Sequence, residues 1–257
     1  MRTSDQQVVR GLTLFADMQE ANFRALMSAA FLQKFPPQVI LIREGELPDF
    51  LFVLVAGAVE MYASHAERRT TLQVIIPPAT FIVVPVVRQE VPLMSARTLV
   101  NSEVLMIPAE AVREIFSRDS AFARAVVAEL ALRFRDMVRA LKNQKLRTGT
   151  ERLANWILQT DARSGHTGRL NLPFEKRLLA SLLGMTPENL SRGFATLAEH
   201  GLTTEGQAII IRDRRKLQRL ARENLLIEEI ASVKCQKRER SHALRRPASN
   251  PSIRRQD

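Results

Sequence analysis

Residues 173–202 (PFEKRLLASLLGMTPENLSRGFATLAEHGL) constrain the fold more than any other stretch of this sequence. They read as two short helices joined by a tight turn at Gly184 and Met185. Thr186 can cap the second helix through its hydroxyl, and Pro187 suits the first helical position because its missing N–H had no partner there. Apolar residues at helical spacing mark the core faces of both helices: Leu178, Leu179, Leu182, Leu183, Leu190, Phe194 and Leu197. We therefore predict a helix-turn-helix.

The second helix carries a polar face that suits base reading. Glu188, Ser191 and Arg192 share that face at spacings i, i+3 and i+4 near its N-terminus. Arginine can donate two hydrogen bonds to guanine, glutamate can accept from cytosine, and serine can do either. With Thr186 and Asn189 these residues form the predicted DNA-binding set. The alternative is an ordinary pair of helices with a solvated face.

The segment that follows favours DNA binding. Residues 202–204 and 208–211 read as two short strands, and Gly206 supplies the turn between them. A β-hairpin behind a helix-turn-helix indicates a winged helix.

Length and composition set wider limits. A chain of 257 residues with 46% hydrophobic content can build one or two folded domains. It contains no run of about eighteen apolar residues that would predict a membrane span, and its start does not resemble a signal peptide. Its one cysteine, Cys235, excludes an internal disulfide framework and an all-cysteine iron–sulfur site, and it indicates a reducing compartment. We expect a cytoplasmic protein.

The positive charge of the chain is unevenly distributed. The formal net charge is +11, and residues 234–257 contribute eight basic residues against two acidic ones. A basic protein suggests a polyanionic partner. Because over half of the excess lies in a stretch that reads as a disordered tail, the total charge is weaker support for DNA binding than the helix face.

The first half of the chain changes character twice. Residues 4–34 carry a helical pattern with Phe23, Leu26 and Phe31, which Pro36 and Pro37 would end. Short β-rich runs then alternate with turn signals, which predicts an antiparallel barrel or sandwich; the runs are 39–42, 50–55, 59–62, 71–76, 81–84 and 104–107.

A long helix without proline or glycine is predicted from Asp119 to Gln144, after a short one at 109–116. Five apolar residues recur along it at coiled-coil spacing and form the predicted dimer interface: Val127, Leu130, Phe134, Met137 and Leu141. The alternative is that this stripe packs on its own domain. Because the seam is shorter than about four heptads, a homodimer would need help from the β domain.

These patterns divide the chain into four parts. The predicted boundaries are 1–118 for a β-rich sensor domain, 119–147 for the dimerisation helix, 148–230 for the winged helix-turn-helix domain and 231–257 for the basic tail. A hinge is expected near Thr148 and Gly149, and a helix from 151 to 160 contains the single tryptophan, Trp156. Asp213 can cap a final helix that we expect to run to about Ile230. The fold class is α+β.

In this order of parts the chain resembles the Crp/Fnr family of bacterial transcription regulators over roughly residues 12–222. The resemblance rests on these motifs: Glu44-Gly45, Asp49 and Gly57 in the β domain, then Leu172-Pro173, Leu179-Ala180, Leu183-Gly184, Glu188-x-x-Ser191-Arg192, Leu197 and Gly201-Leu202. It implies a cyclic-nucleotide-binding-like β-roll and a homodimer acting on double-stranded DNA with RNA polymerase. The Glu-x-x-Ser-Arg pattern is similar to the Fnr/FixK branch, which implies palindromes with TTGA half-sites.

The sensor domain departs from family members that bind cyclic AMP. Those members carry a Gly-Glu pair for the ribose and an arginine for the phosphate, where this chain has Val83-Val84 and Met94. A buried cyclic nucleotide would be left with unpaired polar groups, which argues against cyclic AMP. The cysteine cluster of iron–sulfur members is also missing.

Three interpretations of the sensor domain stay open. The first is an apolar effector pocket lined by Phe81, Val83, Val84 and Met94, which the resemblance to nitric-oxide-responsive, haem-binding relatives suggests. Haem would need an axial ligand, but the only histidine of the β domain, His65, lies in a polar turn. The second is no effector, as in FixK-like members. The third is redox control through Cys235.

Two other classes of protein fit this sequence less well. The sequence contains no Gly-rich phosphate loop, metal-ligand spacing or nucleophile elbow that would indicate an enzyme. A regulatory module of the cyclic-nucleotide type that does not bind DNA would need the phosphate-binding residues and would not need the Glu188, Ser191 and Arg192 face.

Overall fold

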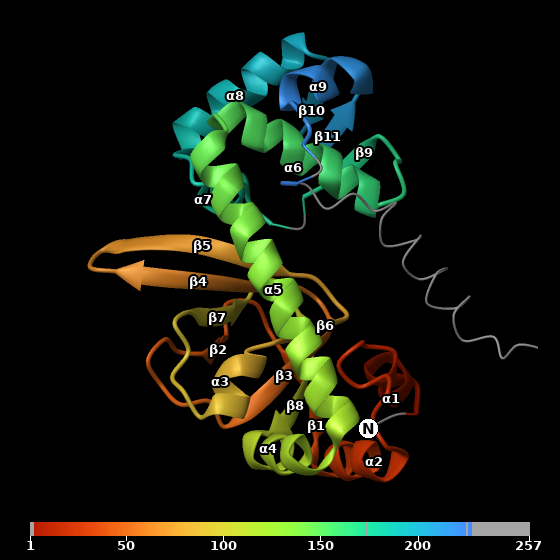
Figure 1. The fold of residues 1–257 in the computed structure, drawn as a ribbon. Helices are drawn as coiled ribbons and strands as arrows, with labels where there is room; N and C mark the ends of the chain where they lie inside the picture. The colour runs from red at the N-terminus through yellow and green to blue at the C-terminus, as the bar shows by residue number, and fades with distance from the viewer. Residues whose placement is uncertain (1–2, 173, 225, 228–257) are drawn as a thin grey trace, which may run out of the picture.

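A long helix, α5 (Ser120–Leu146), connects the two lobes of the chain (Figure 1). The computed structural model describes residues 3–172, 174–224 and 226–227. The predicted basic tail, 231–257, and Cys235 lie outside these residues. Within the described ranges, none of the helices has the length and apolar character that crossing a bilayer requires.

The N-terminal lobe contains two four-stranded antiparallel sheets, ordered β1-β8-β3-β6 and β2-β7-β4-β5. This confirms the antiparallel β structure that the sequence predicts for the region between residues 39 and 107, although the lobe also contains helices. Its elements before α5 are α1 (Thr3–Arg10), α2 (Glu20–Ala29), β1 (Phe31–Phe35), β2 (Ile40–Ile42), β3 (Phe50–Ala56), β4 (Val59–His65), β5 (Arg68–Ile75), β6 (Ala79–Phe81), α3 (Val83–Arg88), β7 (Ser95–Thr98), β8 (Ser102–Pro108) and α4 (Ala109–Arg118).

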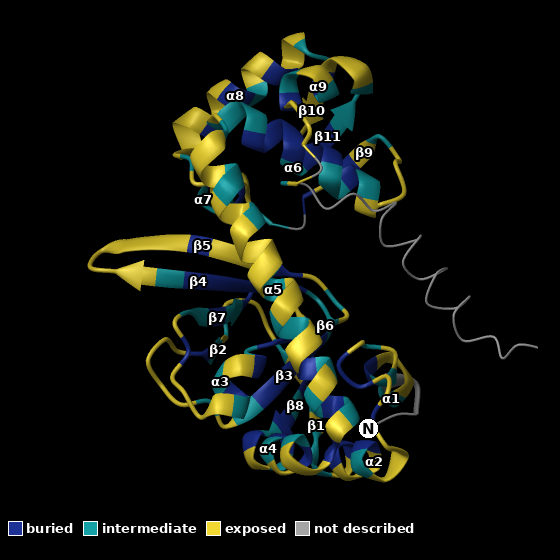
Figure 2. Cartoon of the chain, viewed as in Figure 1, coloured by how far each residue is buried: buried dark blue, intermediate teal, exposed yellow. Residues whose placement is uncertain are grey.

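Strand β3 shows how the lobe is layered. Side chains alternate between the two faces of a strand, and all of residues 51–54 are nearly inaccessible to solvent. Leu51 and Val53 belong to the core that β3 shares with the helices. Phe52 and Leu54 belong to a second core, which contains residues of both sheets. The strand is buried on both faces along its middle (Figure 2), and its sequence is apolar throughout, without the polar alternation of a sheet that faces water.

Two sequence predictions for this lobe are wrong. The helical pattern does not continue to residue 34, because α2 ends at Ala29 and Phe31 begins a strand that pairs with β8, opposite Met106. Residues 83 and 84 are not in a strand either. β6 ends at Phe81, Ile82 takes a left-handed conformation with φ 58°, and Val83 begins the short helix α3.

The start of α5 is fixed by a buried carboxylate. Asp119 caps the helix by accepting from the N–H groups of Ala121 and Phe122, both at 3.0 Å, and its other oxygen accepts from Asn22 and the Gln19 N–H. Burial alone would raise the pKa of Asp119, but the hydrogen bonds, led by that of Asn22, outweigh burial and hold the pKa below its ordinary value. Asp119 thus attaches α5 to the N-terminal end of α2.

The C-terminal lobe consists of α6 (Gly149–Arg163), β9 (Arg169–Asn171), α7 (Lys176–Leu182), α8 (Pro187–Glu199), β10 (Leu202–Glu205), β11 (Ala208–Ile211) and α9 (Arg214–Ala221). The predicted hairpin of β10 and β11 is confirmed, and β9 adds a third strand beside β11. Asp213 caps α9 as predicted, through its contact with the Lys216 N–H. The helix ends at Ala221, however, and Leu226 is exposed, so the predicted extension to Ile230 is not seen over the described residues.

Candidate nucleic-acid interface

Helix α8 begins as its sequence predicts. Thr186 takes an extended conformation, its hydroxyl accepts from the Asn189 N–H at 3.2 Å, and Pro187 occupies the first turn. The turn before it needs a left-handed residue, and Gly184 supplies one with φ 61°. The predicted helix-turn-helix is therefore present, with α7 and α8 as its two helices (Figure 1).

The two faces of α8 differ in burial. Leu190 and Leu197 are buried in the core of the lobe, and Phe194 is half-buried against it. Gly193 is buried as well, and a Cβ there would lie 3.2 Å from the Leu153 side chain of α6. This close approach lets α8 lie directly on α6.

The opposite face of α8 presents the predicted reading residues. Thr186, Glu188, Asn189, Ser191 and Arg192 are all exposed. The structure therefore brings this predicted set together on one surface, at the N-terminal end of the helix.

Electrostatics organise this surface. Arg192 Nη2 donates to Asn189 Oδ1 at 2.5 Å, so Asn189 orients the guanidinium of Arg192. The pKa of Glu188 is lowered, first by a hydrogen bond from its own backbone N–H, then by the Thr186 hydroxyl and the nearby charge of Arg192. Glu188 is therefore an ionised acceptor at neutral pH, close to the positive charge of Arg192.

A buried arginine connects the helix-turn-helix to the end of α5. Arg152 donates to the carbonyl oxygens of Leu183 at 2.8 Å and Gly184 at 3.3 Å in the turn, and to that of Arg147 at 2.7 Å. Burial lowers the pKa of Arg152 from its ordinary value. Sequence reasoning missed this residue, because an arginine within an amphipathic helix ordinarily indicates a solvated position.

A second buried polar residue supports the wing. Asp161 of α6 is fully buried, accepts from the Gly168 N–H at 2.7 Å and forms an ion pair with Arg214 of α9. It was also missed, because the sequence does not show which basic residue would reach it. Trp156, predicted as a core residue, is half-buried and packs beside Phe174.

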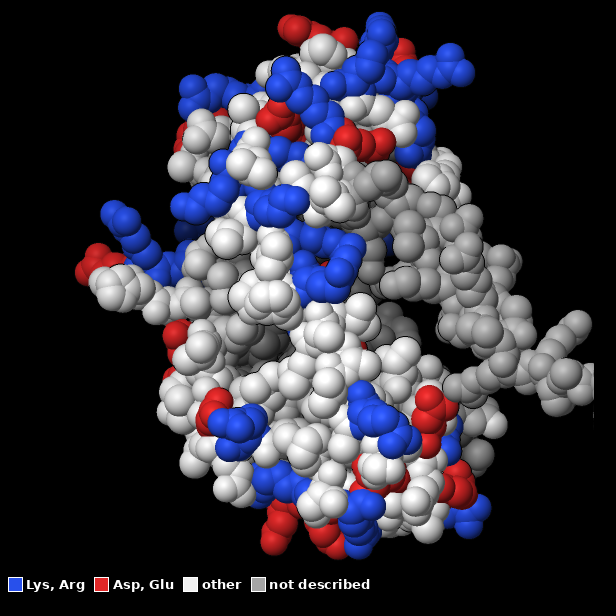
Figure 3. Space-filling view, viewed as in Figure 1, with Lys and Arg blue, Asp and Glu red and all other residues white. Residues whose placement is uncertain are grey.

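Basic side chains are numerous on the lobe that carries α8. Figure 3 shows lysine and arginine over the visible face of this lobe, with some acidic groups among them. Lys176 and Arg177 begin α7, and Arg212, Arg215 and Arg219 are exposed near the wing and α9. Such side chains can neutralise phosphates without reading sequence.

The predicted dimer seam lies on an unpartnered part of α5. Val127, Phe134, Met137 and Leu141 are each more than half exposed, at 58 to 65%. Leu130 differs, since it is half-buried and packs on the core of the N-terminal lobe.

The structure does not bring the four predicted effector-pocket residues together. Phe81 is stacked on Phe52 in the core that contains residues of both sheets, and Met94 packs against the same core. Val83 belongs to the other core, and Val84 is 39% exposed. His65 is exposed at the end of β4, so it does not fit the role of a haem ligand in a pocket.

Comparisons with known proteins agree with this architecture. Residues 32–119 match the cyclic nucleotide-binding domain, and residues 151–220 match the Crp-like helix-turn-helix domain. The chain is 23% identical, over 81% of its length and 96% of the relative's, to the CRP-like cAMP-activated global transcriptional regulator of Mycobacterium tuberculosis. It is 32% identical over 116 residues to the nitrogen fixation regulation protein FixK of Azorhizobium caulinodans, covering 41% of this chain and 47% of FixK.

Solved structures show the same fold. FixK2 from Bradyrhizobium japonicum aligns with a TM-score of 0.68 and 23% identity over 74% of this chain and 96% of its own. A Crp/Fnr-family regulator from Eubacterium rectale aligns with a TM-score of 0.67 and 19% identity, over 82% of this chain and 99% of its own.

Proposed function

Because this chain belongs to the Crp/Fnr family of DNA-binding transcription regulators, we propose that it acts as a homodimer that reads a TTGA-type palindrome through α8. Glu188, Ser191 and Arg192 read the bases, and Asn189 and Thr186 support them. The observation that carries this proposal is the pairing of an exposed, ionised Glu188 with an oriented Arg192 on one face of α8. These groups match the cytosine and guanine edges of the major groove.

The homodimer forms through the seam on α5, which joins the sensor domain, 1–118, to the DNA-binding domain, 148–230. Four exposed apolar side chains at coiled-coil spacing would be costly to leave in water, and a second copy of the helix would cover them. A C2 dimer places two α8 helices on successive major grooves about one helical turn apart, which requires a palindromic site.

The sensor domain of the proposed regulator does not use cyclic AMP. The two valines that stand in place of the family's Gly-Glu pair are a buried core residue, Val83, and a partly exposed one, Val84, so neither offers an acceptor to a ribose hydroxyl. Of the remaining interpretations, DNA binding without an effector, as in FixK-like members, is the one we favour. Phe81, Val83, Val84 and Met94 do not line one pocket, because they are distributed over two cores and the surface.

The experiment is fluorescence anisotropy with the full chain and a labelled TTGA-N6-TCAA duplex, with no ligand added and a scrambled duplex as control. We expect selective binding to the palindrome that survives at high salt, where contacts to phosphates alone weaken. Binding that is equal on both duplexes, with and without cyclic AMP, would contradict the assignment of Glu188, Ser191 and Arg192 as base readers.

Calorimetric titration with cyclic AMP tests the sensor separately. The proposal expects no heat of binding, and a saturable heat would overturn it. If the chain prefers the palindrome to the scrambled duplex only after haem and nitric oxide are added, the sensor domain controls DNA binding through an effector.

A further inference from the structure

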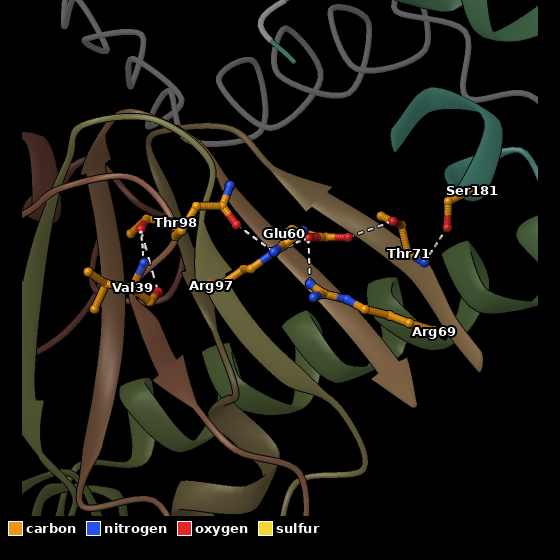
Figure 4. A network of polar contacts seen from close by, with 8 residues as sticks. Val39, Glu60, Arg69, Thr71, Arg97, Thr98 and Ser181 are labelled. Carbon is orange, nitrogen blue, oxygen red and sulfur yellow. Dashed lines mark hydrogen bonds and ion pairs between the residues drawn. The ribbon is translucent and has the colours of Figure 1, made fainter. Parts of the chain in front are cut away.

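A cleft separates the β-roll from the DNA-binding lobe at the edge of sheet β2-β7-β4-β5. It has a volume of about 630 Å³ and is lined by residues of both lobes. At one point the walls are hydrogen-bonded, because the Thr71 N–H of β5 donates to Ser181 Oγ of α7 at 2.8 Å (Figure 4). The cleft therefore lies where a bound molecule would touch both lobes at once.

The β-roll wall of the cleft holds more positive than negative charge. Glu60 is 3% exposed, and its Oε2 accepts from both Arg69 Nη2 at 2.9 Å and Arg97 Nε at 2.6 Å. Its Oε1 accepts from Thr71 Oγ1 at 2.6 Å. One carboxylate thus accepts hydrogen bonds from two guanidinium groups. Figure 4 shows the side chains of Arg69, Arg97 and Thr71 directed at Glu60. One positive charge is left over in this cluster.

The surroundings compensate this surplus charge only in part. Arg69 lies over the Tyr62 ring, 3.5 Å from its centroid, and Arg97 Nη1 donates to Gln38 Oε1 at 2.5 Å. A ring face and an amide attract a cation but carry no negative charge. The two arginine side chains are only 37% and 25% exposed, so water screens their mutual repulsion incompletely. A second anion would relieve that repulsion.

The opposite wall supplies a third guanidinium group. Arg177 lines the cleft from α7, is exposed, and makes no ion pair with any residue that the structure describes. Glu175 also lines the cleft, so the lining residues carry three arginines against two glutamates. Phe174, Leu178 and Leu99 add apolar surface for the body of a ligand.

We propose that this cleft binds a small anion through a phosphate or carboxylate group, held by Arg69 and Arg97 on the β-roll and by Arg177 on α7. Guanidinium groups match the paired oxygens of both kinds of group. Such an anion is a bridge between the lobes and favours the arrangement in which α7 lies on β5. Its effect on DNA binding rests on the proposed function, whereas its binding does not.

The proposed site differs from the pocket that the sequence predicts. None of Phe81, Val83, Val84 and Met94 lines the cleft, and neither do Glu188, Ser191 and Arg192 of α8. A ligand here therefore leaves the reading face free. The ligand would contact α7, which is joined to α8 by the tight turn at Gly184. By binding one arrangement of the lobes more tightly than another, the ligand can still favour one orientation of α8.

The test is calorimetric titration of the full chain with inorganic phosphate, compared with sodium chloride at the same ionic strength. We expect saturable phosphate binding that chloride does not reproduce, and about tenfold weaker binding in Arg177→Gln because a charge-assisted hydrogen bond is lost. The matched control is Arg88→Gln, which removes an exposed arginine of α3 that pairs with Glu90 outside the cleft. The control should bind phosphate like the unmodified chain.

A second variant and a second anion, the dicarboxylate succinate, separate the possible failures. Ser181→Ala removes the acceptor between the lobes but no charge, so a bridged site predicts weaker phosphate binding in this variant as well. The proposal would be overturned if phosphate affinity were unchanged in both Ser181→Ala and Arg177→Gln, or if Arg88→Gln reduced it as much as Arg177→Gln does. It would also be overturned if neither phosphate nor succinate bound. Failure of the proposed function shows differently, as loss of selectivity for the TTGA duplex.

Discussion

The DNA-binding lobe and the β-roll assemble their polar groups by different routes. Glu188, Ser191 and Arg192 lie within five consecutive residues of α8, and helical spacing alone places them on one face. Glu60, Arg69 and Arg97 come from β4, β5 and β7. Glu60 lies opposite Arg97 in the register of β4 and β7, and the side chain of Arg69 reaches Glu60 from β5. A local site and an assembled site thus occur in one chain.

This difference has a consequence for mutation. A local site needs only its helix, so a substitution at an exposed position of α8 should change DNA binding and leave folding intact. An assembled site depends on distant segments, so a substitution there should also change stability. The predictions below test this division, from the largest expected effect to the smallest.

The largest effect is expected at the seam of α5, which both lobes share. Phe134→Asp places a charge in the proposed helix–helix contact and should separate the dimer, weakening binding to the palindrome by about a hundredfold because the second half-site no longer adds to the first. Sedimentation gives the oligomeric state, and anisotropy gives the affinity. Leu132→Asp is the matched control, since Leu132 is 52% exposed on the opposite face of α5. A dimeric Phe134→Asp variant with normal affinity would contradict the seam.

Arg192→Ala tests the local site itself. The loss of its paired hydrogen bonds should cost about 1–3 kcal/mol on the palindrome and leave binding to scrambled DNA nearly unchanged. Urea unfolding should give the same free energy as the unmodified chain, because Arg192 is exposed. Equal losses on both duplexes would show that Arg192 contacts phosphates and not bases.

Asp119→Asn tests, through pH, another polar contact that distant segments of the chain assemble. The lowered pKa of Asp119 means that its charged form stabilises the folded state above its ordinary pKa of 3.8, and that this stability is lost as pH falls through the still lower folded pKa. The variant should therefore be less stable by about 1–2 kcal/mol at pH 7. Urea unfolding between pH 7 and pH 3 should show the difference shrinking only below about pH 4. A difference that does not depend on pH would mean that the charge of Asp119 has no part in it.

Thr186→Ala should have the smallest effect. Removing the cap of α8 should cost about 1 kcal/mol of stability in the DNA-binding lobe. Thr186→Ser keeps the hydroxyl and serves as the control, with unchanged thermal unfolding and DNA affinity. If Thr186→Ser loses affinity while it keeps stability, the Thr186 methyl group contacts DNA directly.

The same division explains what could be predicted from the sequence. The cap, the turn and both faces of α8 were predictable, because Thr186, Pro187 and Gly184 act on their immediate neighbours. The strand at Phe31 was not, since its apolar spacing also fits a helix and only pairing with β8 decides between them. Glu60 was not singled out either, because a glutamate in an alternating strand ordinarily faces water. Its two arginine partners depend on strand register, which this sequence does not specify.

The junction after α5 leaves little freedom between the lobes. Only Arg147 and Thr148 separate α5 from α6. Thr148 is held by reciprocal hydrogen bonds with Glu151, and the carbonyl oxygen of Arg147 is held by Arg152. A connection this short cannot lengthen, so the lobes can change their relative angle but hardly their separation. A change in the β-roll that passes along the chain therefore reaches α8 as torsion in the backbone dihedrals of Arg147 and Thr148, in addition to the direct contact between β5 and α7.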